Sequence, residues 1–277
     1  MWEEINEKQN TDEMLQLQYY ARNAYDNSTR ISILKIIVLI INIVLAVINK
    51  DTIFLSALFF TIFAFLEILE RKFVKNAAKA RNLFDEILFK LNITHDDEKK
   101  IKEKAYNLCK RRKNDFEIQK RNLGTDNPPG LKNWYTKNSG KNRNEIVFKC
   151  QIENTKWDKR VTEIDFIIFI VALLIVFSIT IFKYYNKTLS ELISGMLSCI
   201  ELIYEIIKRI YLYYSYNKNL SKRECLIEEF SKSKIQKENL KSLQTLIVKR
   251  REMDLVPLNF IHSKISLTMH ELISKFN

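Results

Sequence analysis

The sequence predicts an all-α integral membrane protein with two transmembrane helical hairpins, four spans in all, and a helical cytoplasmic domain built from the central and C-terminal segments. Three observations support this fold class. Long apolar runs with few or no charges recur along the chain. Only four Gly and three Pro occur among 277 residues, which favours long helices over strands and turns. Lys and Arg bring the net charge to +12 and gather in the polar segments between the runs.

Lys and Arg also set the expected topology. They are dense in the central polar segment and sparse in the two short turns at residues 49–51 and 183–188. The positive-inside rule therefore places both termini and the central segment in the cytoplasm, and both turns outside. The expected order is an N-terminal cytoplasmic helix (1–30), hairpin 1 (31–70), a cytoplasmic helical region (71–163), hairpin 2 (164–214) and a C-terminal cytoplasmic helical region (215–277).

The clearest span is Phe166–Phe182, which carries no charge and lies between Asp165 and Lys183. As a helix it reaches roughly 25 Å at about 1.5 Å per residue, close to the ~30 Å of a bilayer core. Apolar residues occupy all of its faces, which is typical of a buried or membrane-spanning helix. Tyr184 and Tyr185 follow it, where interfacial anchors belong. The alternative is a central helix in a large soluble core.

The first hairpin joins two apolar runs, Ile31–Ile48 and Thr52–Leu69, through the polar turn at residues 49–51. Lys35 lies one turn from the start of the first run, where a lysine can reach the membrane interface by extending its side chain. Asn42 lies near the middle of that run and needs a polar partner in hydrocarbon, so we expect it to face another helix.

The polar segments are predicted to be helical. Apolar residues at helical spacing indicate a helix over residues 73–91, and Thr94 with Asp97 resembles a capping box that opens a helix to about Lys113. The stretch Gly124–Gly130 contains two prolines and predicts a loop. A helix from about Asn144 is expected to continue into the central span.

The C-terminal region is also predicted to form helices separated by a break. Residues 217–251 show helical spacing, a break follows at 254–257, and a last helix is expected over 258–276. The residues expected to point inward are Leu226, Phe230, Leu240, Leu243 and Ile247.

The fourth span, Thr188 to about Tyr214, carries polar residues three or four positions apart, and this spacing places them on one helix face. Intramembrane carboxylates face a bundle interior or water. Two interpretations stay open: the face holds the four helices together, or it lines a water-filled path, in the monomer or in an oligomer. The bundle-interior or pore-lining candidates are Ser190, Ser194, Ser198, Glu201 and Glu205, and Lys208 continues the same face.

Catalytic, metal and redox chemistry are poorly supported. His95, His262 and His270 are not spaced as metal ligands, and the four cysteines lie far apart without a C-x-x-C pair. No nucleophile elbow or phosphate-binding glycine loop occurs. The sequence therefore predicts a protein that is not an enzyme, with no catalytic residues, no metal and no resident cofactor.

The basic excess has two interpretations. One is topology together with attraction to anionic lipid, worth about 1 kcal/mol per basic residue near the surface. The other is a site for an anionic ligand. The run Lys132-Asn133-Trp134-Tyr135 offers a charge, an amide and two aromatic rings, which suit phosphate pairing and base stacking. Spacing places a second polar set on one helix face, although both sets could instead be structural: Gln151, Asn154, Trp157 and Asp158.

The chain resembles the SMODS-associated four-transmembrane effectors of bacterial anti-phage signalling, of the cyclic-oligonucleotide-based CBASS type. The similarity spans nearly the whole chain, and the order of the motifs around two hairpins carries it. The matching pieces are Gln9-Asn10, the early hairpin, Lys132-Asn133-Trp134-Tyr135, Cys150-Gln151-x-x-Asn154-x-x-Trp157-Asp158, and Arg250 ahead of Val256-Pro257-Leu258-Asn259-Phe260.

This resemblance implies a function. A partner nucleotidyltransferase makes a cyclic di- or oligonucleotide, the cytoplasmic domain binds it, and the spans of a homo-oligomer breach the bacterial inner membrane, without direct nucleic-acid binding. It also adds Arg250 to the candidate ligand-binding residues. Two alternatives remain: a constitutive small ion channel or transporter, and a membrane-anchored scaffold that recruits a protein partner.

Overall fold

The regular secondary structure of the described chain is helical throughout. The computed structural model describes residues 1–48, 53–93, 98–122, 126, 128–184 and 200–253. Within these residues it contains eight helices and no strand, so the all-α class is confirmed. The predicted capping box at Thr94, much of the Gly124–Gly130 loop, the 183–188 turn beyond Tyr184 and the C-terminal helix after residue 253 lie outside the described residues.

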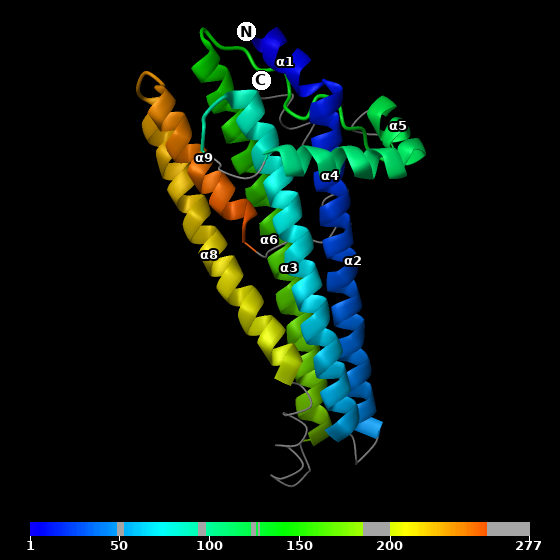
Figure 1. Ribbon diagram of the computed structural model, residues 1–277. Helices are drawn as coiled ribbons and strands as arrows, with labels where there is room; N and C mark the ends of the chain where they lie inside the picture. The colour runs from blue at the N-terminus through cyan, green and yellow to red at the C-terminus, as the bar shows by residue number, and fades with distance from the viewer. Residues whose placement is uncertain (49–52, 94–97, 123–125, 127, 185–199, 254–277) are drawn as a thin grey trace.

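Four long helices run the length of an elongated molecule (Figure 1). They are α2 (Asp12–Ile48), α3 (Ile53–Phe89), α6 (Arg143–Tyr184) and α8 (Ile200–Ser231). The shorter helices gather at one end of it (Figure 1): α1 (Trp2–Gln9), α4 (Glu98–Arg111), α5 (Lys113–Arg121) and α9 (Lys237–Arg251). We call this end the head, which comprises the short helices, the loop residues 128–142, and residues 12–30, 72–89, 143–165 and 215–231. The stem comprises residues 31–48, 53–71, 166–184 and 200–214.

The surface of the stem is apolar on all four long helices. In the described part of the chain, only Met1, Tyr106 and Ile118 are exposed large apolar residues of the head, whereas every long helix exposes several in the stem. Water-soluble surfaces rarely hold apolar patches of this extent, so the stem surface is suited to lipid. Examples of exposed apolar stem residues on the four helices are Ile40, Ile68, Ile167, Phe182, Ile207 and Tyr211.

Among the described residues, one helix is long and apolar enough by itself to cross a membrane. It covers Asp12–Leu45 within α2, close to the N-terminus, and about two fifths of its apolar window is buried against the rest of the protein. The four-span topology stays a prediction. Asn42 is buried, at 3% exposure, as expected for a polar residue that faces another helix.

The head has a continuous apolar core to which α1, α2, α3, α6 and α9 contribute. Met14 of α2, Phe84 of α3 and Leu243 of α9 are fully buried in it. Of the residues expected to point inward in the C-terminal region, Phe230, Leu240, Leu243 and Ile247 are buried and Leu226 is partly buried. The helical pattern of residues 217–251 is divided, however, between α8 and α9.

A capping box fixes the start of α9. Gln236 is the N-cap, its backbone N–H donates to Asn239 Oδ1 at 2.9 Å, and its side chain accepts from the N3 backbone. Amide side chains perform the role that Ser or Thr with Glu usually perform. The boundary was therefore not visible in the apolar periodicity alone.

Candidate functional site

A loop after α5 is fastened to the end of α1 by two neighbouring amide residues. Gln9 Oε1 accepts from the Tyr135 N–H at 3.0 Å, and Gln9 Nε2 donates to the Tyr135 carbonyl at 3.3 Å. Asn10 Oδ1 accepts from the Asn133 N–H at 3.0 Å, and Asn10 Nδ2 donates to Asn133 Oδ1 at 2.8 Å. Asn133 has φ +54°, a left-handed conformation that Asn tolerates well. Gln9 and Asn10 therefore set the position of the aromatic pair in this loop.

Tyr135 is buried in the head in a polar network centred on Asp85 of α3. The Tyr135 hydroxyl donates to Asp85 Oδ1 at 2.7 Å and accepts from Asn154 Nδ2 at 2.7 Å. Gln244 Nε2 and Arg251 Nη2 donate to the other oxygen, Asp85 Oδ2, at 2.9 and 2.8 Å. Burial raises the pKa of Tyr135 well above its ordinary value, so the phenol stays protonated and donates.

A second carboxylate, Asp158 of α6, is partly buried, with 27% of its side chain exposed, and pairs with arginines from α8 and α9. Its Oδ2 accepts from Arg223 Nη1 at 2.9 Å, and its Oδ1 lies 3.9 Å from Arg250 Nη2. The Arg250 guanidinium lies over the Tyr216 ring, 4.6 Å from its centroid. Although burial opposes ionisation of Asp158, Arg250 and Arg223 lower its pKa, so the carboxylate is charged.

Arg81 of α3 brings a further cation to the same interior. Its guanidinium lies 3.4 Å from the centroid of the Trp134 ring and makes no ion pair within the described residues. Burial, with the nearby Arg251 charge, lowers the pKa of Arg81 to about 10, which still leaves it charged at neutral pH. Tyr25 of α2 lies within electrostatic reach of Arg81, Arg250 and Asp158. We call Arg81, Arg223, Arg250 and Arg251, with Asp85 and Asp158, the arginine cluster.

Several buried polar atoms at this cluster have no hydrogen-bond partner among the described residues. They are Nε and Nη2 of Arg223, Nε of Arg250, Nδ2 of Asn82 and Oε1 of Gln151. Arg223 is completely buried, and Arg250 and Asn82 are more than nine-tenths buried. An unpaired buried donor costs about 1–3 kcal/mol, and more when it is charged. Such donors are satisfied by an anion that accepts several hydrogen bonds.

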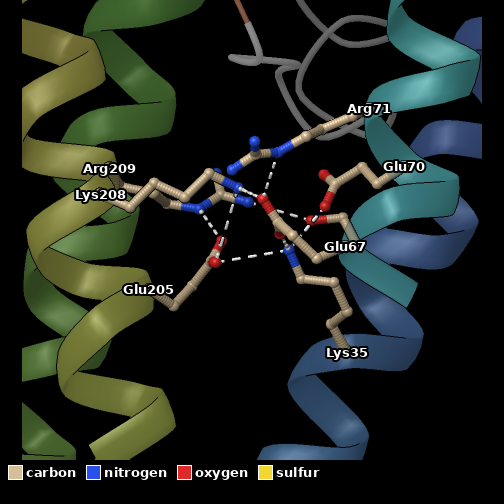
Figure 2. Close-up of polar contacts among 8 residues, drawn as sticks. Lys35, Glu67, Glu70, Arg71, Glu205, Lys208 and Arg209 are labelled. Carbon is tan, nitrogen blue, oxygen red and sulfur yellow. Dashed lines mark hydrogen bonds and ion pairs between the residues drawn. The ribbon is translucent and has the colours of Figure 1, made fainter. Parts of the chain in front are cut away.

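A second ionic cluster lies in the stem (Figure 2). Lys35 of α2 is 1% exposed, and its Nζ contacts Glu67 Oε2 at 2.5 Å and Glu70 Oε2 at 2.6 Å. It also lies 3.3 Å from Oε2 of Glu205 on α8. Lys35 was expected to extend to the membrane interface, and that expectation is wrong. The antiparallel partner α3 supplies two carboxylates at the same level, so the ammonium points inward.

Further cations complete this stem ionic cluster, which we define as Lys35, Glu67, Glu70, Arg71, Glu205, Lys208 and Arg209 (Figure 2). Lys208 Nζ lies 2.5 Å from Glu67 Oε1, and Arg209 Nε donates to Glu205 Oε1 at 3.1 Å. Arg209 Nη2 also donates to Ser32 Oγ at 3.0 Å. The cluster therefore connects α2, α3 and α8 inside the apolar stem, where breaking any one pair leaves a charge in a medium of low dielectric.

Residues 3–269 match the family model described as the SMODS-associating 4TM effector domain. The chain belongs to this family. No match was found among curated proteins or among solved structures. The resemblance proposed from the sequence motifs is thereby confirmed.

Membership gives this SMODS-associating 4TM effector a role at a coarse level. The family is a non-enzymatic membrane effector domain of CBASS-type antiviral defence, and its name implies a partner nucleotidyltransferase that produces a signal. In the described part of the chain, no group of three or more His, Cys, Asp or Glu is arranged to hold a metal ion.

The effector's structure brings together most of the predicted ligand residues. Trp134, Tyr135 and Asn154 lie at the Asp85 network or on Arg81, and Gln151 Nε2 donates to Gln244 Oε1 at 3.0 Å. Asp158 and Arg250 are paired as described above. Lys132 and Asn133 are exposed, and Trp157 is half-buried. The assignment of these residues to ligand binding stays a prediction.

The predicted polar face of the fourth span is only partly described. Ser190, Ser194 and Ser198 lie outside the described residues, and for Glu201 the backbone is described, as part of α8. Glu205 is 3% exposed and belongs to the stem ionic cluster. In this structure Glu205 connects helices, and a pore-lining role stays a prediction.

Sequence reasoning missed Arg81, Asp85, Arg223 and Arg251. For Arg81 a signal existed: it stands four residues after Ala77 and three before Phe84, on the face expected to be apolar. A charged residue at an inward position needs a buried partner. The contact that Arg81 makes is with the Trp134 ring in the loop after α5, so spacing within one helix could not identify it.

Glu153 of α6 predicts a pH dependence of the head. It is buried, and Thr136 donates to its Oε2 from the backbone N–H at 3.2 Å and from the hydroxyl at 3.1 Å. Burial raises the pKa of Glu153 from 4.5 to about 7, although these hydrogen bonds lower it. Because the folded state favours the protonated carboxyl, its stabilising contribution is complete below about pH 4.5 and is lost as the pH rises through 7.

We therefore expect Glu153→Gln to unfold at a higher temperature than the wild type at pH 8 and at a similar temperature at pH 5. The difference in unfolding free energy at pH 8 is at most about 3 kcal/mol. Thermal unfolding of the detergent-solubilised protein at both pH values measures it. Glu103→Gln, at an exposed position of α4, is the matched control. An equal loss of stability in Glu153→Gln at both pH values would contradict the expectation.

Proposed function

We propose that this effector binds a cyclic nucleotide through its head and then permeabilises the bacterial inner membrane, which causes abortive infection. The ligand is made by the partner nucleotidyltransferase. The proposed binding residues are those predicted from the sequence, with the arginine cluster added: Lys132, Asn133, Trp134, Tyr135, Gln151, Asn154, Trp157, Asp158 and Arg250, with Arg81, Arg223 and Arg251.

The observation that carries this proposal is the buried excess of guanidinium groups in the head. Arg223 and Arg250 hold unpaired donors away from solvent. Attraction to lipid head groups acts on basic residues near the membrane surface, so it does not account for these buried atoms. A phosphate that accepts hydrogen bonds from guanidinium forks does.

The route from head to membrane follows the long helices. Arg81 lies on α3, Asp158 on α6 and Arg223 on α8, and each of these helices continues into the stem. A ligand shifts a conformational equilibrium only when it binds one state more tightly than the other. We expect the ligand to bind more tightly to a rearranged state of the head in which it accepts hydrogen bonds from the unpaired donors. This difference in affinity between the two states would drive the rearrangement.

The membrane part of the proposal has four spans, with the turns at 49–51 and 183–188 outside, both termini cytoplasmic, and a homo-oligomer as the permeabilising form. The stem ionic cluster places charged side chains inside the part of the stem whose surface is apolar. Separation of α8 from α2 and α3 would expose these charges to lipid and draw in water.

The test uses the full-length protein in liposomes loaded with a self-quenched dye. A panel of cyclic mono-, di- and trinucleotides is added, and binding and leakage are measured. We expect leakage only with a nucleotide that binds, and Arg250→Ala to weaken that binding about tenfold or more, because a hydrogen bond to a charged group is lost. Lys232→Ala, at an exposed position just after the end of α8, is the control.

The alternatives predict other results. A constitutive channel would leak without any nucleotide. A scaffold would bind a protein partner stably and leave the membrane intact. Failure of the whole panel to bind would overturn the proposed function.

A further inference from the structure

The charges of the arginine cluster do not balance among the described residues. Arg251 is paired with Asp85 at 2.8 Å. Asp158 is shared between Arg223 and Arg250, so one of those two cations is uncompensated. Arg81 makes no ion pair in the described part of the chain and lies against the Trp134 ring instead. Four guanidinium groups and two carboxylates leave two positive charges in the interior of the head.

The unpaired nitrogens of Arg223 lie side by side on its guanidinium group. Arg223 uses Nη1 for Asp158 and leaves Nε and Nη2 without partners. Nε and Nη2 form one edge of the planar guanidinium, and this edge donates two parallel hydrogen bonds to two oxygens of a carboxylate or phosphate. Arg250 Nε, on the other arginine that shares Asp158, is unpaired as well.

The second uncompensated charge, on Arg81, lies next to Asn82 and the Trp134 ring. Arg81 is next in sequence to Asn82, whose Nδ2 is unpaired, while Asn82 Oδ1 accepts from Arg251 Nη1 at 3.2 Å. The Arg81 guanidinium lies 3.4 Å from the centroid of the Trp134 ring, a cation–π contact that uses none of its hydrogen-bond donors. Positive charge and unpaired donors thus occur at two places in one cluster.

We propose that the arginine cluster is a site for a ligand with two phosphodiester charges, a cyclic dinucleotide. One phosphate takes the Nε/Nη2 edge of Arg223 with Nε of Arg250, and the other takes Arg81 with Asn82 Nδ2. This inference rests on the proposed function and adds to it the ligand class. Asp158 acts as a positioning residue that holds Arg223 and Arg250 by their other nitrogens.

The first test needs no variant. Cyclic AMP, cyclic di-AMP and cyclic tri-AMP, and the corresponding guanine and mixed adenine–uracil compounds, are titrated against the detergent-solubilised full chain by calorimetry. We expect the tightest compound to be a dinucleotide, about tenfold or more tighter than any mono- or trinucleotide. A trinucleotide as the tightest ligand would overturn this inference and leave the proposed function standing. If no compound binds, the proposed function itself fails.

The second test uses Arg223→Lys, which retains the charge and removes the fork. We expect it to weaken dinucleotide binding about tenfold or more, because a lysine ammonium cannot make two parallel hydrogen bonds. Lys222→Arg, at the exposed neighbouring position, is the matched control. Thermal unfolding shows whether each variant folds. Unchanged affinity in a folded Arg223→Lys protein would overturn the assignment, and so would an equal loss in Lys222→Arg.

Discussion

Lys35→Met is expected to lower the unfolding free energy of the detergent-solubilised effector by about 3–5 kcal/mol, the usual cost of removing one partner from a buried ion pair. Lys35 contacts Glu67, Glu70 and Glu205 from a position that is 1% exposed. Its loss leaves Glu70 without an ion pair among the described residues, whereas Glu67 and Glu205 keep other cations. Methionine keeps the length of the side chain, so the effect measures charge more than volume.

The measurement is equilibrium unfolding by denaturant, with Lys232→Met as the control. Lys232 also pairs with a glutamate, Glu228, at 2.8 Å, but both side chains are 73% exposed. Such a pair contributes less than about 0.5 kcal/mol. If the two lysine variants lost equal stability, the stem ionic cluster would not stabilise the bundle.

Asp85→Ala is expected to destabilise the head by a similar amount, about 3–5 kcal/mol. The carboxylate is 1% exposed and accepts from the Tyr135 hydroxyl, Gln244 and Arg251. Without it, Arg251 and Arg81 become neighbouring buried cations with no carboxylate between them. Tyr135 also loses the acceptor that orients the aromatic loop.

Near-ultraviolet circular dichroism during unfolding follows this head transition, because Tyr135 and Trp134 lie there. Asp12→Ala is the control: its carboxylate is 70% exposed and pairs with Lys120 at 2.7 Å. Asp85→Asn keeps an acceptor and loses the charge, so its stability should fall between those of the wild type and the alanine variant. An alanine variant as stable as the asparagine variant would show that the network is dispensable.

The sequence identified the helical elements well because long apolar runs and scarce breakers leave few alternatives. The helix that begins near Asn144 and continues into the central span is observed as α6. The helix ends were harder to predict. The division between α8 and α9 depends on the amides of Gln236 and Asn239, which do not change the apolar period.

The candidate site was predicted in part. Aromatic and amide residues such as Trp134 and Asn154 stand in recognisable order along the chain. Their partners, Arg81 and Asp85, lie elsewhere in sequence, and Arg223 lies on α8, which packs against α6 and α9. Periodicity assigns each residue to a face of its own helix, whereas ion pairs depend on which helices pack together and at what level.

Helix α8 carries both Arg223 of the head and Glu205 of the stem. The two residues stand roughly 27 Å apart along one uninterrupted helix, at about 1.5 Å per residue. A rotation of α8 about its own axis would break two ion pairs together, Arg223–Asp158 in the head and Lys35–Glu205 in the stem. Because linkage is reciprocal, whatever loosens the lower contact must alter affinity at the upper one by the same factor. If the head binds a nucleotide as proposed, the packing of α8 in the bilayer would therefore change the affinity for that nucleotide.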